Sequence, residues 1–98
     1  MTTPYKLALT KRAEHQLEAI LADGAERWGI DQAIAYYDDL LEHFDQLCDN
    51  PLLYMEVAHI KPGYRRSVCG AHSIYYRIEQ DMVMIVAILK RQQPETHL

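Results

Sequence analysis

Large apolar residues alternate with other residues over positions 5–9, which is typical of a half-buried strand. After Thr10, a good N-cap residue, apolar side chains recur every three or four positions, so the pattern predicts an amphipathic helix over 11–28. Gly29 is placed to end this helix in a left-handed cap, and Gly24 inside it costs about 1 kcal/mol relative to Ala unless close packing compensates. The apolar positions of this helix are Ala13, Leu17, Ile20, Leu21, Gly24 and Trp28.

A second helical pattern starts near Asp31 and stops at Asn50, because the residue before Pro51 avoids helical backbone. The Asp31 carboxylate suits a helix start both as N-cap and as negative charge. The link between the helices is short, so we expect an antiparallel hairpin. The buried stripe predicted for the second helix consists of Ala33, Ile34, Tyr37, Leu40, Leu41, Phe44, Leu47 and Cys48.

The second half of the chain carries the features of strands separated by turns. Strands are predicted at 64–69, 73–78 and 82–89, and a short one is possible at 56–60. The 82–89 segment is the most apolar, so we expect it to be central. The order of elements predicts an α+β fold, in which an N-terminal strand is followed by a helical hairpin packed on a three- or four-stranded antiparallel sheet. The other sheet face should be partly open, and the polar tail 91–98 frayed.

Size and composition indicate one globular domain, since the chain has 98 residues and is 49% hydrophobic. No apolar run approaches a membrane span and no signal peptide is evident, which favours a cytoplasmic protein without a membrane partner. Cys48 and Cys69 lack metal-ligand spacing and are expected as free thiols. The five histidines lack such spacing as well, so neither a metal nor another cofactor is expected.

Charge is distributed unevenly along the chain. Residues 1–54 hold four Lys/Arg and ten Asp/Glu, whereas residues 55–98 hold six Lys/Arg and four Asp/Glu. The net charge of −4 is too acidic for strong nonspecific binding to nucleic acid, and no sequence-specific contact with it is expected. The cations of the second half are sufficient for a local patch.

Arg65 and Arg66 are consecutive on a predicted strand, so they point to opposite sheet faces and at most one reaches the open face. Either they are surface and edge arginines, or one is aimed at a phosphate or a partner's carboxylate. His72, after a Gly-Ala turn, is either a structural hydrogen-bonding group or a general acid or base. Lys90 and Arg91 either protect a strand end or extend the basic site.

Three aromatic side chains are expected to pack in or beside the core. Tyr75 and Tyr76 alternate faces, so one should be buried under the hairpin and the other should lie on the open face. Trp28 is predicted to be a core anchor.

The chain resembles the RelE/ParE superfamily of toxins, and its ParE branch in particular. Matching segments run along nearly the whole chain, and no single one is specific. They are Tyr5 to Leu9, Leu17-Glu18-Ala19-Ile20, Arg27-Trp28-Gly29, Gln32-Ala33 with Tyr36, Ile60-Lys61-Pro62-Gly63-Tyr64-Arg65-Arg66, His72-Ser73-Ile74-Tyr75-Tyr76-Arg77 and Val83 to Leu89.

The resemblance implies a type II toxin–antitoxin toxin, bound in a hetero-oligomer by a ParD-like antitoxin whose C-terminal segment covers the groove between helices and sheet. ParE-like toxins inhibit DNA gyrase by binding, whereas RelE-like toxins cleave messenger RNA on the ribosome. The acidic composition and the lysine after Leu89 favour the gyrase branch, because an ordinary lysine is a poor base at neutral pH. Ala87 and Lys90 replace the family's usual Arg and His, so an inactive antitoxin-binding remnant is a third alternative.

These expectations assign roles to particular residues. The target contacts are expected at Arg65, Arg66, Lys90 and Arg91. The antitoxin contacts are expected around Trp28, Tyr37 and Tyr76. No catalytic residue is expected of a gyrase inhibitor, while a nuclease would use Arg65, Arg66, His72 and Lys90.

Overall fold

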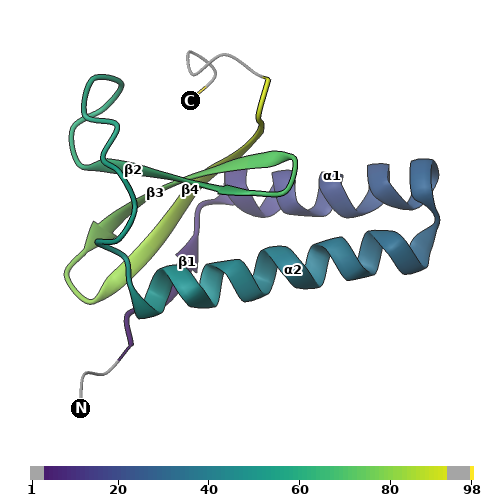
Figure 1. Ribbon diagram of the computed structural model, residues 1–98, viewed down its shortest axis with the longest axis horizontal. Helices are drawn as coiled ribbons and strands as arrows, with labels where there is room; N and C mark the ends of the chain where they lie inside the picture. The colour runs from purple at the N-terminus through teal and green to yellow at the C-terminus, as the bar shows by residue number, and fades with distance from the viewer. Residues whose placement is uncertain (1–3, 93–97) are drawn as a thin grey trace.

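Two helices and a four-stranded sheet make up the protein, in a computed structural model that describes residues 4–92 and residue 98 (Figure 1). Both helices and the three C-terminal strands form within one or two residues of their predicted positions. The elements are β1 (Lys6–Leu9), α1 (Lys11–Trp28), α2 (Ile30–Asp49), β2 (Tyr64–Cys69), β3 (His72–Glu79) and β4 (Met82–Lys90).

The sheet has the order β1-β4-β3-β2, so β4 is an inner strand as predicted. Strands β2, β3 and β4 form an antiparallel meander, but β1 pairs with β4 in parallel, which makes the sheet mixed. Beyond the end of β1, side chains form hydrogen bonds to the backbone of β4. The Thr10 hydroxyl donates to the Val86 carbonyl at 2.9 Å, and the Ile88 amide donates to Gln16 Oε1 at 2.7 Å.

Of the three predicted helix caps, only that of Thr10 forms as expected, because Gly29 ends its helix at ψ 155°, outside the left-handed helical region, and Asp31 does not cap. Thr10 accepts a hydrogen bond from the Ala13 amide and caps α1. Gly29 ends α1 and also begins α2, at φ 93° and ψ 155°, an extended positive-φ conformation that is essentially restricted to glycine. The predicted cap role of Asp31 is wrong. Because a single glycine links the helices, Asp31 already lies in the first turn of α2, where its charge still suits the helix dipole.

The main core lies between the helical hairpin and one face of the sheet. It includes Leu40, Phe44 and Leu47 of α2, each with no exposed surface. Ile34 and Leu41 were predicted to be buried but are 45% and 36% exposed, because the stripe on α2 is narrower than the sequence pattern indicates.

The opposite face of the sheet is more covered than predicted. Tyr75, Ala87 and Leu89 are buried there, beneath a cluster that includes Val57 and the partly buried Leu98. The predicted strand at 56–60 reduces to one isolated bridge between Glu56 and Arg65. The face remains accessible nearer the β2 edge, at half-buried Arg66 and exposed Val68. Apart from residues 91, 92 and 98, the predicted frayed tail lies outside the described residues.

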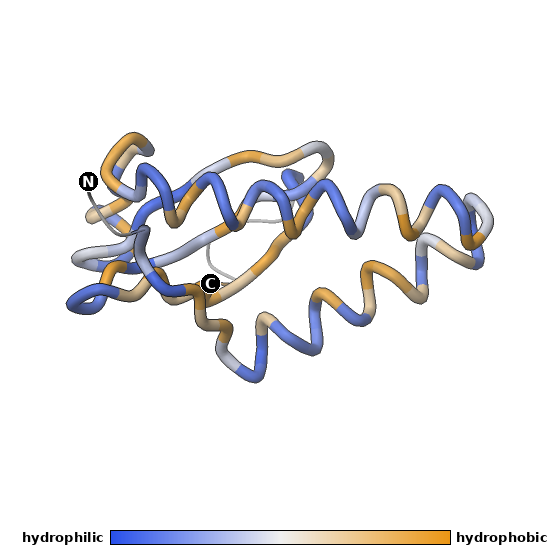
Figure 2. The backbone as a smooth tube through the Cα atoms, turned by 90° about the horizontal axis from the view of Figure 1, so that it is seen from below, coloured by the Kyte–Doolittle hydropathy of each residue, from blue (hydrophilic) through white to orange (hydrophobic). Residues whose placement is uncertain are grey.

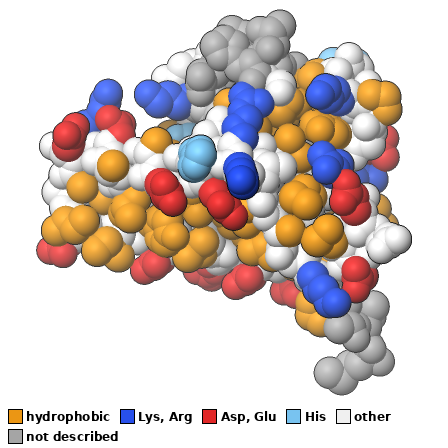
Figure 3. All heavy atoms as spheres, turned by 180° about the vertical axis from the view of Figure 1, so that it is seen from behind, with side chains coloured by type: hydrophobic (Ala, Val, Ile, Leu, Met, Phe, Trp, Pro, Cys, Tyr) orange, Lys and Arg blue, Asp and Glu red, His pale blue; other side chains and the backbone are white. Residues whose placement is uncertain are grey.

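The hairpin projects well beyond the sheet, as Figure 1 shows, so part of its apolar surface has no sheet to pack on. Apolar and polar segments alternate along both helices (Figure 2), and hydrophobic side chains gather over them when the molecule is viewed from behind (Figure 3). Trp28, predicted to be a core anchor, is 68% exposed at the far end of α1, so that prediction is wrong.

Close contact holds the projecting helices together. A Cβ added at Gly24 would lie 3.3 Å from Ala33 Cβ, so this glycine lets α1 and α2 approach and offsets its low helix propensity. In the part of the chain that the structure describes, neither helix combines the length and apolarity needed to cross a bilayer.

Candidate functional site: a groove between the hairpin and the sheet

An apolar groove of about 590 Å³ lies between the projecting part of the hairpin and the end of the sheet. Most of its wall comes from α1 and α2, and the remainder from the β2–β3 turn, the first residue of β3 and the last residue of β4. It is lined by Ala19, Ile20, Asp23, Gly24, Trp28, Gln32, Ala33, Tyr36, Ala71, His72 and Lys90.

Tyr36 of α2 joins the helices to the β2–β3 turn at the side of this groove. Its hydroxyl accepts a hydrogen bond from the Ala71 amide at 3.1 Å and lies 3.1 Å from the Cys69 carbonyl. The same oxygen is 2.7 Å from Nδ1 of His72. Gly70 leaves the space for this contact, since a Cβ there would lie 2.7 Å from Tyr36 Cε1. The turn is therefore fixed against the helix by one side chain.

His72 is the first residue of β3 rather than part of the turn, and it is buried. Burial, and secondly the positive charge of Lys90, which pairs with it across β3 and β4, lower the pKa of His72 below 6.5. An imidazole that is buried, neutral and bonded to a tyrosine hydroxyl fits the structural alternative. Its hydrogen-bond partner is the side chain of Tyr36.

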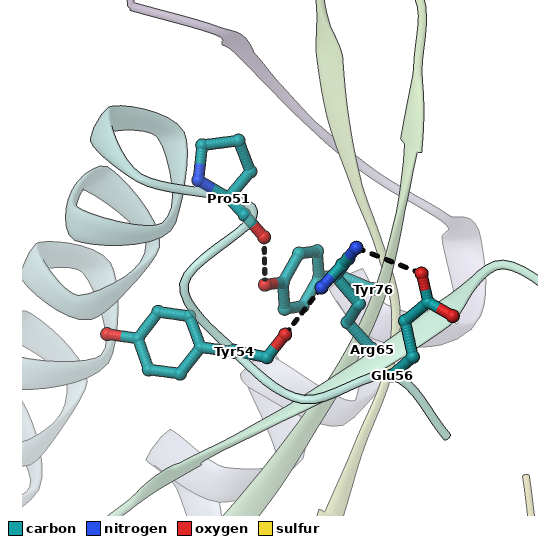
Figure 4. Close-up of polar contacts among 5 residues, drawn as sticks. All are labelled: Pro51, Tyr54, Glu56, Arg65 and Tyr76. Carbon is teal, nitrogen blue, oxygen red and sulfur yellow. Dashed lines mark hydrogen bonds and ion pairs between the residues drawn. The ribbon is translucent and has the colours of Figure 1, made fainter. Parts of the chain in front are cut away.

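Arg65 points to the helix side of the sheet and stabilises the 51–56 loop (Figure 4). Its Nη1 donates to the Tyr54 carbonyl at 2.6 Å, and its Nη2 forms an ion pair with Glu56 at 3.0 Å. Beside it, the Tyr76 hydroxyl donates to the Pro51 carbonyl at 2.6 Å, and burial raises the pKa of Tyr76 to about 12. The side chain of Arg65 is only 16% exposed, so little of it is accessible.

Arg66 points to the opposite face, as the alternation along β2 predicts. Its Nε and Nη2 donate to Ser73 Oγ at 3.1 and 3.0 Å, so its hydrogen-bond partner is neutral. Arg91 is exposed at the end of β4, where its amide donates to the Ala71 carbonyl. The four predicted target contacts are therefore dispersed: Arg65 lies under a loop, Arg66 on the opposite face, and Lys90 and Arg91 at the strand end.

The three residues expected to contact an antitoxin are also separated. Trp28 lines the groove, whereas Tyr37 is half-buried and does not. Tyr76 has no exposed surface, so it presents nothing to a partner in this conformation.

Sequence reasoning missed the contacts that fix the hairpin to β2. His43 Nε2 lies 2.7 Å from Ser67 Oγ, and burial lowers the pKa of His43. Tyr36 belongs to the resemblance, but its contacts with the turn were not foreseen. Each contact joins residues at least 24 positions apart, so only the helix-to-sheet register could have revealed it.

The family model and the curated relatives that match this chain are ParE toxins. Residues 7–94 match the family model described as "ParE toxin of type II toxin-antitoxin system, parDE". Toxin ParE1 of Caulobacter vibrioides is 27% identical over 95 residues, covering 97% of each chain. Toxin ParE1 of Mycobacterium tuberculosis is 32% identical over 85 residues, covering 86% of this chain and 87% of the relative.

Solved structures share the fold at lower sequence identity. A chain of the chromosomal ParDE toxin–antitoxin system from P. aeruginosa superposes with a TM-score of 0.77 at 20% identity, covering 88% of this chain and 95% of that one. A chain of the toxin–antitoxin complex RelBE2 from Mycobacterium tuberculosis gives 0.70 at 19% identity, covering 91% and 100%.

Proposed function

This chain belongs to the ParE toxin family of type II toxin–antitoxin systems, and we propose on that premise that it inhibits DNA gyrase by binding. Inhibition requires no catalytic group in the toxin. A cognate ParD-like antitoxin neutralises it by forming a hetero-oligomer, and both proteins act in the cytoplasm.

Binding is favoured over catalysis because the groups that a nuclease would need are dispersed in the structure. Arg65 and Arg66 point to opposite sheet faces, and Arg65 is already engaged by Tyr54 and Glu56. A transition state on phosphate requires a cation and a proton-transfer group within hydrogen-bond reach of one reacting centre. His72 lies beside Lys90, but neither arginine joins them in the lining of the groove.

The groove is the proposed site of the antitoxin. Its wall combines Ile20, the exposed ring of Trp28 and the Gly24–Ala33 contact, which together form a concave apolar surface. An amphipathic segment laid into such a groove gains affinity from buried apolar area. Of the three residues first assigned to the antitoxin, Trp28 keeps this role in the proposal.

Target contact is assigned to three of the four cations. Arg66 is half-buried on the sheet face opposite the hairpin, Arg91 is exposed just after β4, and Lys90 lines the groove. An antitoxin in the groove would cover Lys90 and stand close to Arg91. Neutralisation would then follow because antitoxin and target compete for neighbouring surfaces.

Assays with the purified protein separate the alternatives. With DNA gyrase, we expect loss of supercoiling and accumulation of cleaved DNA–enzyme complexes, both prevented by antitoxin. Ribosome-bound messages cut in a parallel translation reaction would contradict the proposal and favour the nuclease. If induced expression leaves growth unaffected and neither assay responds, the protein is an antitoxin-binding remnant.

A further inference from the structure

A second apolar surface runs along the side of the hairpin that faces away from the groove. On α2, Ile30 is 56% exposed and Ile34 is 45% exposed, and further apolar positions follow at three- or four-residue steps on the same side. On α1, Leu21 and Ala25 are one turn apart and half-buried. We call this surface the hairpin seam. It consists of Leu21, Ala25, Ile30, Ile34, Tyr37 and Leu41.

The hairpin seam is distinct from the groove, and the two share no residue. Positions two apart lie on nearly opposite sides of an α-helix. Ile34 is therefore turned away from Tyr36, and Leu21 is turned away from Asp23, and both Tyr36 and Asp23 line the groove. An antitoxin segment in the groove would leave the seam uncovered.

Acidic side chains border the hairpin seam on both sides. Glu14 and Glu18 are exposed on α1, three to seven positions before Leu21, and Asp38 and Asp45 are exposed on α2. Within residues 4–92 and 98, none of these four carboxylates takes part in an ion pair. Figure 3 shows this arrangement from behind, with hydrophobic side chains over the helices between acidic ones.

We propose that the hairpin seam is a docking surface for a cationic amphipathic helix of a partner protein. The partner's apolar stripe would pack between α1 and α2 as the third helix of a bundle. Its Lys or Arg residues, on both sides of that stripe, would pair with the two acidic borders. Ile30 and Leu41 are about 17 Å apart along the axis, so a partner of roughly three turns covers the seam.

Charge selects this occupant among the alternatives. In a second copy of the chain, equal acidic borders would face each other across the contact and repel. An anionic lipid surface would be repelled in the same way. A cationic helix both buries the seam and neutralises its borders. The proposal does not depend on the gyrase assignment, because it uses only exposure, spacing and charge.

Designed peptides test the proposal with the intact protein. The probe is a labelled 18-residue helix with a leucine stripe flanked on both sides by lysines, and its binding is followed by fluorescence anisotropy. One control has Glu in place of Lys, and another has the same composition in an order that is not amphipathic. We expect saturable one-to-one binding of the Lys peptide, at least tenfold tighter than either control and weakened by added salt.

Variants locate the binding site. Replacing both borders, with Glu18→Lys and Asp38→Lys, should weaken the Lys peptide at least tenfold and strengthen the Glu peptide. Ile34→Ser should also weaken the Lys peptide, while the groove variant Gln32→Lys is the matched control and should not. All four positions are exposed, so circular dichroism should report native folding.

Three outcomes would overturn the proposal. The Lys peptide could bind no more tightly than the controls, or it could be lost in the Gln32→Lys variant while Ile34→Ser binds normally. Sedimentation equilibrium could also show a dimer that Ile34→Ser abolishes, which would assign the seam to a second copy. A monomer whose preference shifts from the Lys peptide toward the Glu peptide when the borders are reversed supports the cationic helix.

Discussion

The Tyr36 hydroxyl lies 2.7 Å from Nδ1 of His72 and joins the helical hairpin to the strand that begins beside the groove. The same oxygen also meets the backbone at Cys69 and Ala71. One phenol therefore fixes the position of the β2–β3 turn relative to α2. Because Ala71, His72 and Tyr36 all line the groove, this contact also fixes the shape of the proposed antitoxin site.

Removing that hydroxyl should loosen the turn. We expect Tyr36→Phe to lower the free energy of unfolding by about 1–2 kcal/mol, because the part-buried Cys69 carbonyl and the buried His72 imidazole lose their hydrogen-bond partner. Urea denaturation followed by circular dichroism measures the change. Tyr37→Phe is the matched control, since the Tyr37 hydroxyl forms no hydrogen bond within the described residues. Equal losses in both variants would contradict the role assigned to Tyr36.

Gly70 should tolerate a side chain less well than Gly63. Both have positive φ, 57° and 81°, but a Cβ at Gly63 meets nothing within 4 Å, whereas one at Gly70 would lie 2.7 Å from Tyr36 Cε1. Gly63→Ala should cost about 1 kcal/mol for the backbone alone. Gly70→Ala should cost clearly more, because Tyr36 must move as well. Chemical denaturation of both variants measures the two losses of stability, and a smaller loss for Gly70→Ala than for Gly63→Ala would refute the prediction.

Stability should fall as the solution is acidified below neutral pH. The folded protein holds His72 and His43 with pKa values below the ordinary 6.5, mainly through burial. The unfolded chain therefore binds protons more readily, so this contribution is complete above about pH 6.5 and is lost as pH falls toward the folded pKa values. The free energy of unfolding, measured from pH 7.5 to 5.5, should decline.

Histidine variants test whether His43 and His72 cause this decline in the free energy of unfolding. Replacing both histidines, with His43→Gln and His72→Gln, should flatten the pH dependence in this window. His15→Gln, on the exposed surface of α1, controls for the loss of a histidine and should leave the decline in place. An unchanged slope in the double variant would show that other groups cause it.

The two adjacent arginines should respond differently to alanine substitution. Arg65→Ala removes a 2.6 Å bond to the Tyr54 carbonyl and should lower stability by about 2 kcal/mol. Arg66→Ala removes hydrogen bonds to the neutral Ser73 hydroxyl and should cost less stability while weakening gyrase inhibition. Thermal unfolding and supercoiling assays on both proteins separate the effects. Full inhibition by a folded Arg66→Ala protein would remove Arg66 from the target contacts.

Much of the fold could be predicted from the chain because the determining signals are local. Thr10 caps α1 through its own side chain, Gly29 and Pro51 limit the helices, and Gly63 and Gly70 mark turns at positive φ. The alternation along β2 also predicted that only one of the paired arginines reaches the second sheet face. These features depend on neighbours within a few residues.

The predictions that were wrong concern features that depend on packing between residues far apart in the sequence. Helical spacing placed Trp28 on an apolar stripe, but it could not show that the sheet ends before covering the far end of α1. The parallel pairing of β1 with β4 depends on which sheet edge the first strand reaches. The cover over Tyr75, built in part by Val57 and Leu98, brings together residues from separate parts of the chain.

Stoichiometry of gyrase inhibition tests the central claim most directly. A toxin that acts by binding must be present in amounts comparable to its target, whereas a catalyst acts at a small fraction of them. With gyrase held above the dissociation constant, titration should show inhibition that rises linearly and saturates near a fixed molar ratio. Undiminished supercoiling at excess protein, together with many messages cut per toxin molecule on ribosomes, would contradict the account.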